Sequence, residues 1–349
     1  MDTRPKIGLA LGGGGARGFA HVGVLKVLER EGIPVDLIVG TSMGALVGAA
    51  YALKPDAAAL EARISEFFAD EAPQNRGLRR LEKIHPFNLA KTNFMHRLVR
   101  IAEKHLFLSL AMLKKALVSE EEVRETLRVF LPDVDTDQTT IPYAAVAADL
   151  VSGRGVVLRE GSLIEVVLAS CAVPGFMAPV RREEMILADG AVVERIPTNP
   201  ATFLGAEIVI GVDAGFSLCR VPPIEDGIDA INRAMEIMSF YLNRRSREKA
   251  DILIEPSVKQ FEWTDFFCYE DIIREGERAA ESKIEEIKAL LRHGFRRKMI
   301  RKFFKGIPWA KKITSPAGDL FEGSPDWVIL EKAPPGTQET SPSEGTLPG

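Results

Sequence analysis

The pentapeptide Gly40-Thr41-Ser42-Met43-Gly44 constrains the fold of this chain more than any other stretch. Residues 35–39 before it are apolar except for Asp36 and predict a buried strand, whereas residues 45–53 after it are small, apolar and favourable to a helix. A serine with a glycine two residues away on each side, between a strand and a helix, is typical of a nucleophile elbow. The alternative is an ordinary tight turn between a strand and a helix.

An elbow of this kind explains both glycines and gives Met43 a role. The turn is sharp, so the serine backbone is strained, and the neighbouring chain passes too close for a Cβ at Gly40 or Gly44. The Oγ of Ser42 then stands exposed at the end of the sheet. The N–H of Met43, at the helix N-terminus, points to the place where an oxyanion would form. We therefore predict Ser42 as a nucleophile and Met43 as an oxyanion donor.

A second glycine-rich stretch follows the first predicted strand, residues 6–11. It reads Gly12-Gly13-Gly14-Gly15-Ala16-Arg17-Gly18 and precedes a helix predicted from Phe19 to about Arg30. Four successive glycines leave their backbone N–H groups free to converge on an anion. We expect Gly13, Gly14 and Gly15 to donate to an oxyanion, with Gly12 and Gly18 supporting the loop.

A nucleotide site is the competing interpretation of this loop. The spacing of Gly13, Gly15 and Gly18 fits a dinucleotide-binding fingerprint, which also requires an acidic residue about 20 positions further on. This chain has Val39-Gly40-Thr41-Ser42 there, without Asp or Glu, so we favour the oxyanion loop over a nucleotide site or a structural turn. Arg17 could bind an anionic substrate, but we favour a role in which it holds its own loop by donating to carbonyl groups.

Together with a third motif, these stretches resemble the patatin-like phospholipase family, and its bacterial members most. The resemblance rests on the glycine-rich loop with Arg17 before its last glycine, on His21 and Gly23-Val24-Leu25, on the serine pentapeptide, and on Asp189-Gly190-Ala191. The family's Ser, Pro, Phe and Pro ahead of the third motif are here Ser170, Pro174, Phe176 and Pro179. The resemblance covers about residues 5 to 215. It implies acyl-ester hydrolysis by a Ser42–Asp189 dyad, without metal or cofactor.

The residues themselves leave several candidate bases for Ser42. Five histidines are present: His21, His85, His96, His105 and His293. Only the last follows the predicted acid, as an α/β-hydrolase order requires, and it lies in a basic helical stretch. We expect His21, one turn past the glycine loop, to be a packed residue that hydrogen-bonds a backbone group.

Three aspartates follow predicted strands. Asp189 can take the serine proton directly if it lies within about 3 Å of Oγ, and Gly190 permits a close approach of the chain. We expect Asp149 and Asp213 to cap turns or anchor loops instead.

The remaining pattern alternates strands with helices and predicts a three-layer α/β/α domain with a mixed, largely parallel sheet. The predicted strands are 143–148 and 155–158, joined by a turn at Ser152-Gly153, then 185–187, 208–212 and 252–254; the predicted helices are 163–170, 225–249 and 270–291. A helical insertion spans about residues 55–140, with helices 57–68, 92–117 and 120–130, the last capped by Ser119. This insertion could cover the active site of a lipid hydrolase, although we favour packing on the body.

We therefore divide the chain into a catalytic domain at residues 5–215, a helical C-terminal extension at 216–333, and a disordered tail at 334–349 that is rich in Pro, Gly, Ser and Thr. Residues 295–312 interleave eight Lys or Arg residues with large apolar ones. This pattern suits an interfacial helix on anionic lipid; the alternatives are a solvated helix docked on the body and a weak nucleic-acid patch.

Composition narrows the remaining choices. The formal net charge of −4 argues against nucleic acid as a partner, and three cysteines without metal spacing suggest a reducing compartment without disulfides. We see no signal peptide and no transmembrane run, and expect a cytoplasmic protein that can be peripheral on a membrane. The predicted function is hydrolysis of phospholipid or lysophospholipid esters at a membrane surface. A non-catalytic membrane adaptor on the same fold and a nucleotide-binding oxidoreductase are the alternatives, and the oligomeric state stays open.

Overall fold

The computed structural model describes residues 4–69, 118–215, 227–292 and 327–330 of the 349-residue chain, with the single positions 218 and 224. The helix predicted over 92–117, the basic segment 295–312 and the tail 334–349 lie outside the described residues, as do all histidines except His21. Among the helices that are described, none combines the length and the apolar character needed to cross a membrane.

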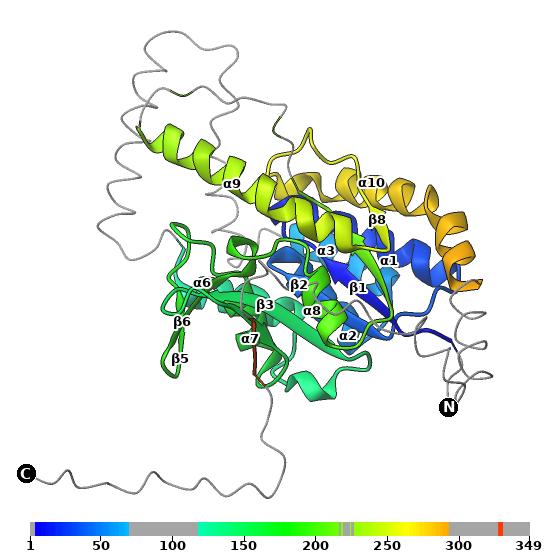
Figure 1. The fold of residues 1–349 in the computed structure, drawn as a ribbon, viewed down its shortest axis with the longest axis horizontal. Coiled ribbons are helices and arrows are strands. Elements are labelled where there is room, and N and C mark those ends of the chain that lie inside the picture. Colours follow the sequence, from blue (N-terminus) through cyan, green and yellow to red (C-terminus); the bar gives the residue numbers. More distant parts are fainter. Residues whose placement is uncertain are drawn as a thin grey trace, which may run out of the picture.

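A nine-stranded mixed sheet forms the centre of the described structure (Figure 1). Its parallel core has the order β3-β2-β1-β7-β8. These strands are β1 (Ile7–Leu11), β2 (Leu37–Thr41), β3 (Tyr143–Asp149), β7 (Ile208–Val212) and β8 (Ile252–Ile254). Antiparallel pairs add β4 (Gly155–Leu158) and β6 (Met185–Asp189) to β3, and β5 (Val180–Arg182) to β6, while β9 (Trp327–Leu330) pairs in parallel with β4. The mixed, largely parallel sheet predicted from the sequence is thereby confirmed.

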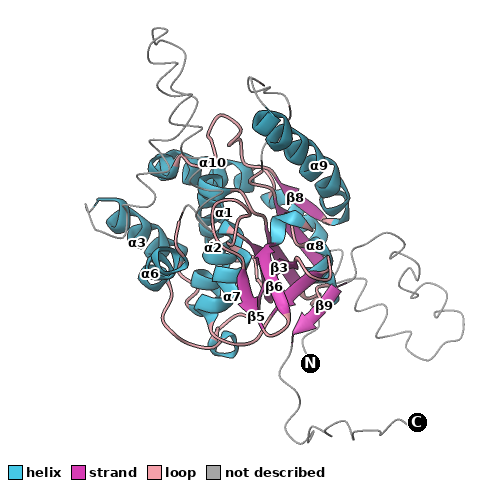
Figure 2. Ribbon diagram, turned by 90° about the vertical axis from the view of Figure 1, so that its left-hand side faces the viewer, coloured by secondary structure: helices cyan, strands magenta, loops and turns pink. Residues whose placement is uncertain are grey.

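Helices cover both faces of the sheet, which gives three layers (Figure 2). One layer contains α1 (Ala20–Arg30), α2 (Met43–Leu53), α3 (Ala57–Ala69), α7 (Leu163–Ser170) and α10 (Tyr269–Glu281), with α6 (Glu120–Phe130) packed on α7. The other contains α8 (Thr198–Phe203) and α9 (Gly227–Lys249). Alternate side chains of β1 serve the two cores, since Leu9 and Leu11 pack with the first layer and Ala10 with the second.

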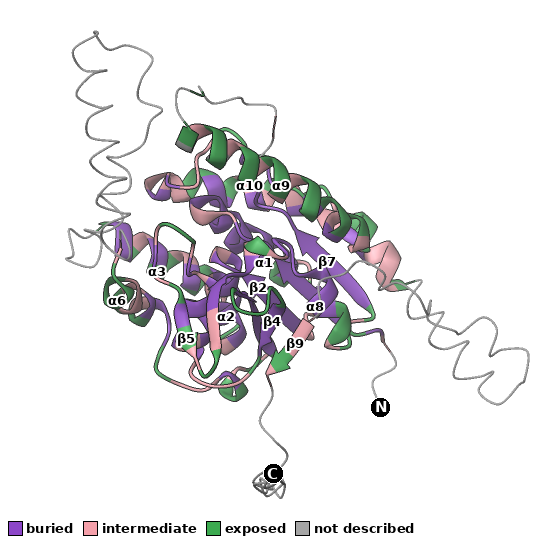
Figure 3. Cartoon of the chain, turned by 60° about the vertical axis from the view of Figure 1, so that its left-hand side comes forward, coloured by how far each residue is buried: buried purple, intermediate pink, exposed green. Residues whose placement is uncertain are grey.

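The central strands are buried along their whole length, whereas the outer helices expose one face (Figure 3). Every predicted strand is present within a few residues, and β2 extends two residues further than predicted, through Gly40 to Thr41. Ser119 caps α6 as predicted, accepting from the Glu122 N–H in a capping box.

The sheet does not end at residue 215, where the sequence suggested the end of the catalytic domain. β8 pairs with β7, β9 pairs with β4, and α10 packs closely on α1. Glycines permit that helix contact: a Cβ on Gly23 would overlap the Ile273 carbonyl, and a Cβ on Gly276 would overlap the Ala20 carbonyl. β9 was not predicted, because a four-residue strand at a sheet edge leaves little pattern in the sequence.

Candidate active site

Ser42 occupies a strained elbow between β2 and α2. Its backbone angles are φ 54° and ψ −123°, a conformation that side-chain-bearing residues rarely adopt. A Cβ on Gly40 would overlap backbone atoms of Gly44 and Ala45, and a Cβ on Gly44 would overlap the Leu11 carbonyl. The strained serine and the close approach at both flanking glycines are therefore confirmed.

Strand β3 brings Ser42 and Asp189 together. Thr41 at the end of β2 pairs with Val146, and Asp189 at the end of β6 pairs with the next residue, Ala147. Because β4 pairs with β3 from Ala145 to Ala148, β2 and β6 share the opposite edge of β3 and meet there end to end. Ser42 and Asp189 thus lie on either side of this meeting point.

Gly190 allows the chain to turn away directly after Asp189. A Cβ at this position would overlap the Val146 carbonyl of β3. The close approach expected for Gly190 is therefore present, and it keeps the aspartate at the very end of β6.

The environment of Asp189 makes its carboxylate unusually basic. Asp189 is 3% exposed and Ser42 is 9% exposed. Burial raises the pKa of Asp189 to about 6, although hydrogen bonds with the Ser42 side chain and with the Ala191 N–H, 2.8 Å from Oδ1, partly offset that rise. A carboxylate with this pKa is mostly ionised at pH 7 and is a better base than one with the ordinary value of 3.8.

Ser170 holds the backbone of the Ser42 elbow through hydrogen bonds. Its hydroxyl donates to the Val146 carbonyl at 2.6 Å and accepts the Ser42 N–H at 3.0 Å, and the residue is fully buried. One hydroxyl therefore ties the nucleophile to β3, the strand that also holds Asp189. The sequence offered Ser170 only as part of a family pattern, without a role.

The glycine loop supplies fewer free donors than expected. Gly12 donates to the Val212 carbonyl and Gly13 to the Arg195 carbonyl, each at 3.0 Å. The prediction that Gly13 donates to an oxyanion is therefore wrong in this structure, because its N–H already has an acceptor. A Cβ on Gly13 would lie 3.3 Å from the Ser42 Cβ, so the residue instead provides room for the nucleophile.

Gly14, Gly15 and Met43 remain as candidate donors. Within the described part of the chain, no acceptor is found for their N–H groups. Gly15 and Met43 line the same cavity as Ser42. Gly18 permits this arrangement, since a Cβ there would overlap the Met43 side chain.

His21 and Arg17 hold the loop, as predicted. The His21 Nε2 lies 2.7 Å from the Gly12 carbonyl, and complete burial lowers the pKa of this histidine to about 4, so the ring is neutral at pH 7. The Arg17 Nε donates to the Gly14 carbonyl at 3.3 Å. Burial, reinforced by the nearby positive charge of Arg195, lowers the pKa of Arg17 to about 10.

The two other aspartates have the structural roles predicted for them. Asp149 accepts from Ser152 Oγ at 2.6 Å and from two N–H groups of the β3–β4 turn. Asp213, after β7, accepts from the Gly215 N–H and pairs with Arg195 at 3.3 Å and with Arg247. Sequence reasoning missed these ion pairs, since Arg195 and Arg247 lie 18 and 34 positions from Asp213 and carry no pattern that links them to it.

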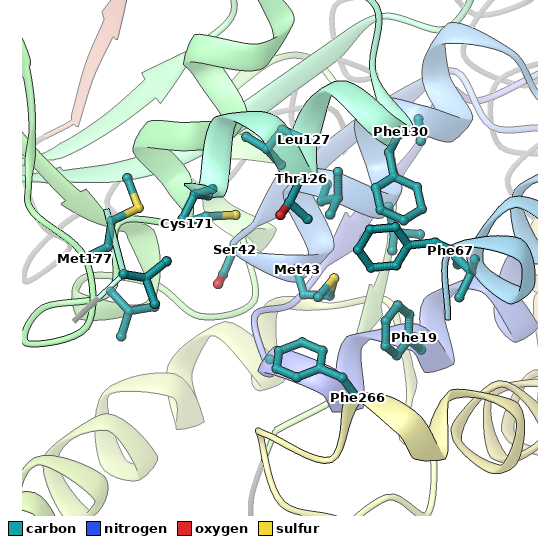
Figure 4. A pocket seen from close by; sticks show the side chains of 18 of the residues that line it. Phe19, Ser42, Met43, Phe67, Thr126, Leu127, Phe130, Cys171, Met177 and Phe266 are labelled. Atoms are coloured by element: carbon teal, nitrogen blue, oxygen red, sulfur yellow. The ribbon is translucent and has the colours of Figure 1, made fainter. Parts of the chain in front are cut away.

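An apolar cavity of about 240 Å³ opens beside Ser42 (Figure 4). The figure shows Ser42 between Cys171 and Met177 on one side and Met43 with a group of phenylalanines on the other. These rings pack edge to face; Phe67 and Phe130, for example, are 5.2 Å apart between centroids. The cavity is also lined by α3 and α6, the two described helices of the predicted insertion. An acyl chain fits such a lining.

Comparison with known proteins identifies the family. The model of the family described as patatin-like phospholipase matches residues 9–202, more than half of the chain. This chain belongs to the patatin-like phospholipase family.

Several relatives share this region. An uncharacterized NTE family protein of Mycobacterium tuberculosis is 32% identical over 211 residues, which are 60% of this chain and 49% of that protein. Patatin-like phospholipase domain-containing protein 6 of Homo sapiens is 32% identical over 215 residues, 61% of this chain and 14% of that protein. The match thus spans about half the length of the mycobacterial relative. Among solved structures, VipD from Legionella pneumophila has a TM-score of 0.42 at 13% identity, over 82% of this chain and 67% of that chain.

Proposed function

We propose that this patatin-like protein is a serine acyl-ester hydrolase that acts on phospholipids or lysophospholipids through a dyad of Ser42 and Asp189. The observation that carries the proposal is the meeting of β2 and β6 beside β3, which places a strained serine next to a buried carboxylate of raised pKa. His21 is the weaker candidate for the base, because burial lowers its pKa to about 4, its Nε2 is engaged by the Gly12 carbonyl, and the Ser42 side chain hydrogen-bonds to Asp189.

The reaction proceeds in two halves. Ser42 Oγ attacks the ester carbonyl while Asp189 accepts its proton, and the N–H groups of Gly14, Gly15 and Met43 stabilise the oxyanion. Asp189 returns the proton to the departing alcohol as the acyl-enzyme forms. Water then attacks the acyl-enzyme with Asp189 as the base, which releases the fatty acid and restores Ser42.

The cavity supports an ester with a long acyl chain. It has a largely apolar lining, and the phenylalanine group extends from Met43 away from Ser42 (Figure 4). Burying a chain there removes apolar surface from water, which favours binding by about 0.8 kcal/mol per methylene. Choosing between phospholipid and lysophospholipid requires measurement, since both present the same scissile ester.

A fluorophosphonate probe tests the nucleophile. We expect wild-type protein to gain one probe adduct, located on Ser42 by peptide mass spectrometry, and Ser42→Ala protein to gain none while keeping its circular dichroism spectrum. Hydrolysis of a panel of phospholipids and lysophospholipids with product identification then defines the substrate. Unlabelled, folded wild-type protein would leave the adaptor alternative as the better explanation, and undiminished short-chain esterase activity in Ser42→Ala would reject the serine.

A further inference from the structure

Helix α9 is longer than the strands it connects. It has 23 residues and is therefore about 34 Å long, whereas β7 before it has five residues and is about 17 Å long. The helix ends at Lys249, three residues before β8, which starts at the amino edge of the sheet. Its first half therefore projects beyond the opposite edge, the one where β1, β2 and β7 end and where Ser42 lies (Figure 1).

The second half of α9 is anchored by hydrogen bonds and an ion pair. Asn243 is fully buried and accepts the Arg195 N–H at 2.6 Å. The Ser246 carbonyl accepts from Thr198, and Arg247 pairs with Asp213. These bonds fix the helix to the loop that carries Arg195, whose carbonyl accepts the N–H of Gly13.

The first half has the opposite distribution of side chains to that of an ordinary surface helix. Its arginine is sheltered: the Arg233 side chain is 12% exposed, donates to the Leu218 carbonyl and pairs with Glu236. Its outward face is apolar. Met238 is 70% exposed, and the same face includes Ile231, Met235, Ile237, Tyr241 and Leu242. A contiguous apolar face of this extent on a projecting helix marks a binding surface.

Two further apolar groups lie at the same edge of the sheet. Leu150 and Val151 follow the end of β3 at the tip of the β3–β4 turn and are exposed. Val192, three residues after Asp189, is also exposed. Three separate segments thus present apolar side chains around the edge that carries Ser42, a distribution that suits a broad apolar surface more than a single peptide.

We infer that the projecting half of α9, residues 227–242, docks this enzyme on the lipid surface that holds its substrate. The inference rests on the proposed function for the identity of the occupant, because a phospholipid ester must leave a lipid layer to reach Ser42. In this arrangement the outward apolar face enters the boundary between head groups and acyl chains. The anchored half holds the catalytic edge against that surface through Asn243 and Arg195.

Docking by an apolar face differs from attraction by charge. Binding through α9 is insensitive to salt, since no ion pairs with lipid are involved, whereas binding through the basic segment 295–312 would weaken as salt rises. Salt dependence therefore separates the two.

The test measures binding to vesicles of phosphatidylcholine and phosphatidylglycerol in a Ser42→Ala background, so that no lipid is consumed. Met235→Gln with Met238→Gln removes apolar area from α9 and keeps helix-forming side chains; Arg244→Gln with Glu248→Gln is the matched control, an exposed pair on the anchored half. We expect the methionine variant to lower the partition coefficient at least roughly tenfold, at low and high salt alike. The control binds like the parent.

Two further measurements complete the experiment. In otherwise wild-type protein, the methionine variant should hydrolyse a soluble short-chain ester at the normal rate and vesicle lipid more slowly. Met238→Trp should shift tryptophan emission to shorter wavelength when vesicles are added, and Arg244→Trp should not. A shift at position 238 without one at position 244 supports insertion of the apolar face.

Several results would overturn the docking role. The first is that the parent protein does not bind vesicles, and the second is that the methionine variant binds them normally. The third is that the methionine variant converts a dimer to a monomer while vesicle binding stays unchanged. Failure of the proposed function gives a different result. In that case the probe does not label Ser42 in wild-type protein, while vesicle binding still depends on Met235 and Met238.

Discussion

Replacing Asp189 by Asn should slow catalysis at least about 10²-fold and at the same time stabilise the fold. The pKa of this carboxyl rises from an ordinary 3.8 to about 6 in the folded protein, so between these pH values the folded state keeps a proton that the unfolded chain has lost. The free energy of unfolding contributed by Asp189 therefore falls as pH rises through this window. Above it, the buried charge costs about 3 kcal/mol, from roughly two pKa units at about 1.4 kcal/mol each.

Asparagine keeps the shape and the bond from the Ala191 N–H but carries no charge. At pH 7 we expect Asp189→Asn to be more stable than wild type by up to about 3 kcal/mol, and at pH 4 or below to be nearly equal to it. His21 contributes a slope of opposite sign, because its lowered pKa of about 4 makes the folded state resist protonation. Only the difference between the two proteins at each pH isolates Asp189.

The assay is urea unfolding followed by tryptophan fluorescence across pH 4 to 7.5, together with kcat on a short-chain ester, which should fall at least about 10²-fold. Asp149→Asn is the matched control. Burial alone would raise the pKa of Asp149, but hydrogen bonds from Ser152 and from N–H groups lower it overall, so this variant should lose stability at neutral pH. A stability difference for Asp189→Asn that does not change with pH would refute the raised pKa of Asp189. An unchanged kcat would refute its role as the base.

Four further predictions follow from the same geometry. The kcat/KM for a soluble ester should rise with pH through an apparent pKa near 6 and then stay level; a step at a clearly higher pH would indicate another base. Ser170→Ala removes the acceptor of the Ser42 N–H and should lower kcat by roughly tenfold with little change in KM, and an unchanged kcat would make Ser170 a packing residue only. Gly44→Ala should lower the free energy of unfolding by about 1–3 kcal/mol in urea titrations, whereas Gly227→Ala, with open space around it, should not. His21→Asn, where it folds, should keep most esterase activity, and a dead but folded variant would require a triad in place of the dyad.

Much of this fold was predictable because short-range patterns determine it. The strands β1, β2 and β7 are short, mainly apolar runs, and the glycines on both sides of Ser42 mark the sharp turn between β2 and α2. The structural roles of Asp149, Asp213 and Arg17 were predictable for the same reason, since turn and loop bonds involve neighbours in sequence.

What the sequence could not predict depends on contacts between distant segments. Gly13 differs from Gly14 only because the Arg195 carbonyl, 182 positions later in the chain, accepts its N–H. Strands β8 and β9 continue the sheet beyond residue 215, and α10 packs on α1 through Gly23 and Gly276, glycines that are 253 positions apart. No local pattern distinguishes these residues from glycines in ordinary loops and helices.

The proposed dyad of Ser42 and Asp189 also depends on contacts between distant segments. No fixed spacing in the sequence relates Ser42 to Asp189. They meet because β2 and β6 pair with successive stretches of the same edge of β3. Ser170 ties the elbow to the same strand through the Val146 carbonyl, the oxygen that also excludes a side chain at position 190. A shift of β6 by one residue along β3 would turn Asp189 to the opposite face of the sheet. The register of three residue pairs between β3 and β6 therefore decides whether the carboxylate faces Ser42.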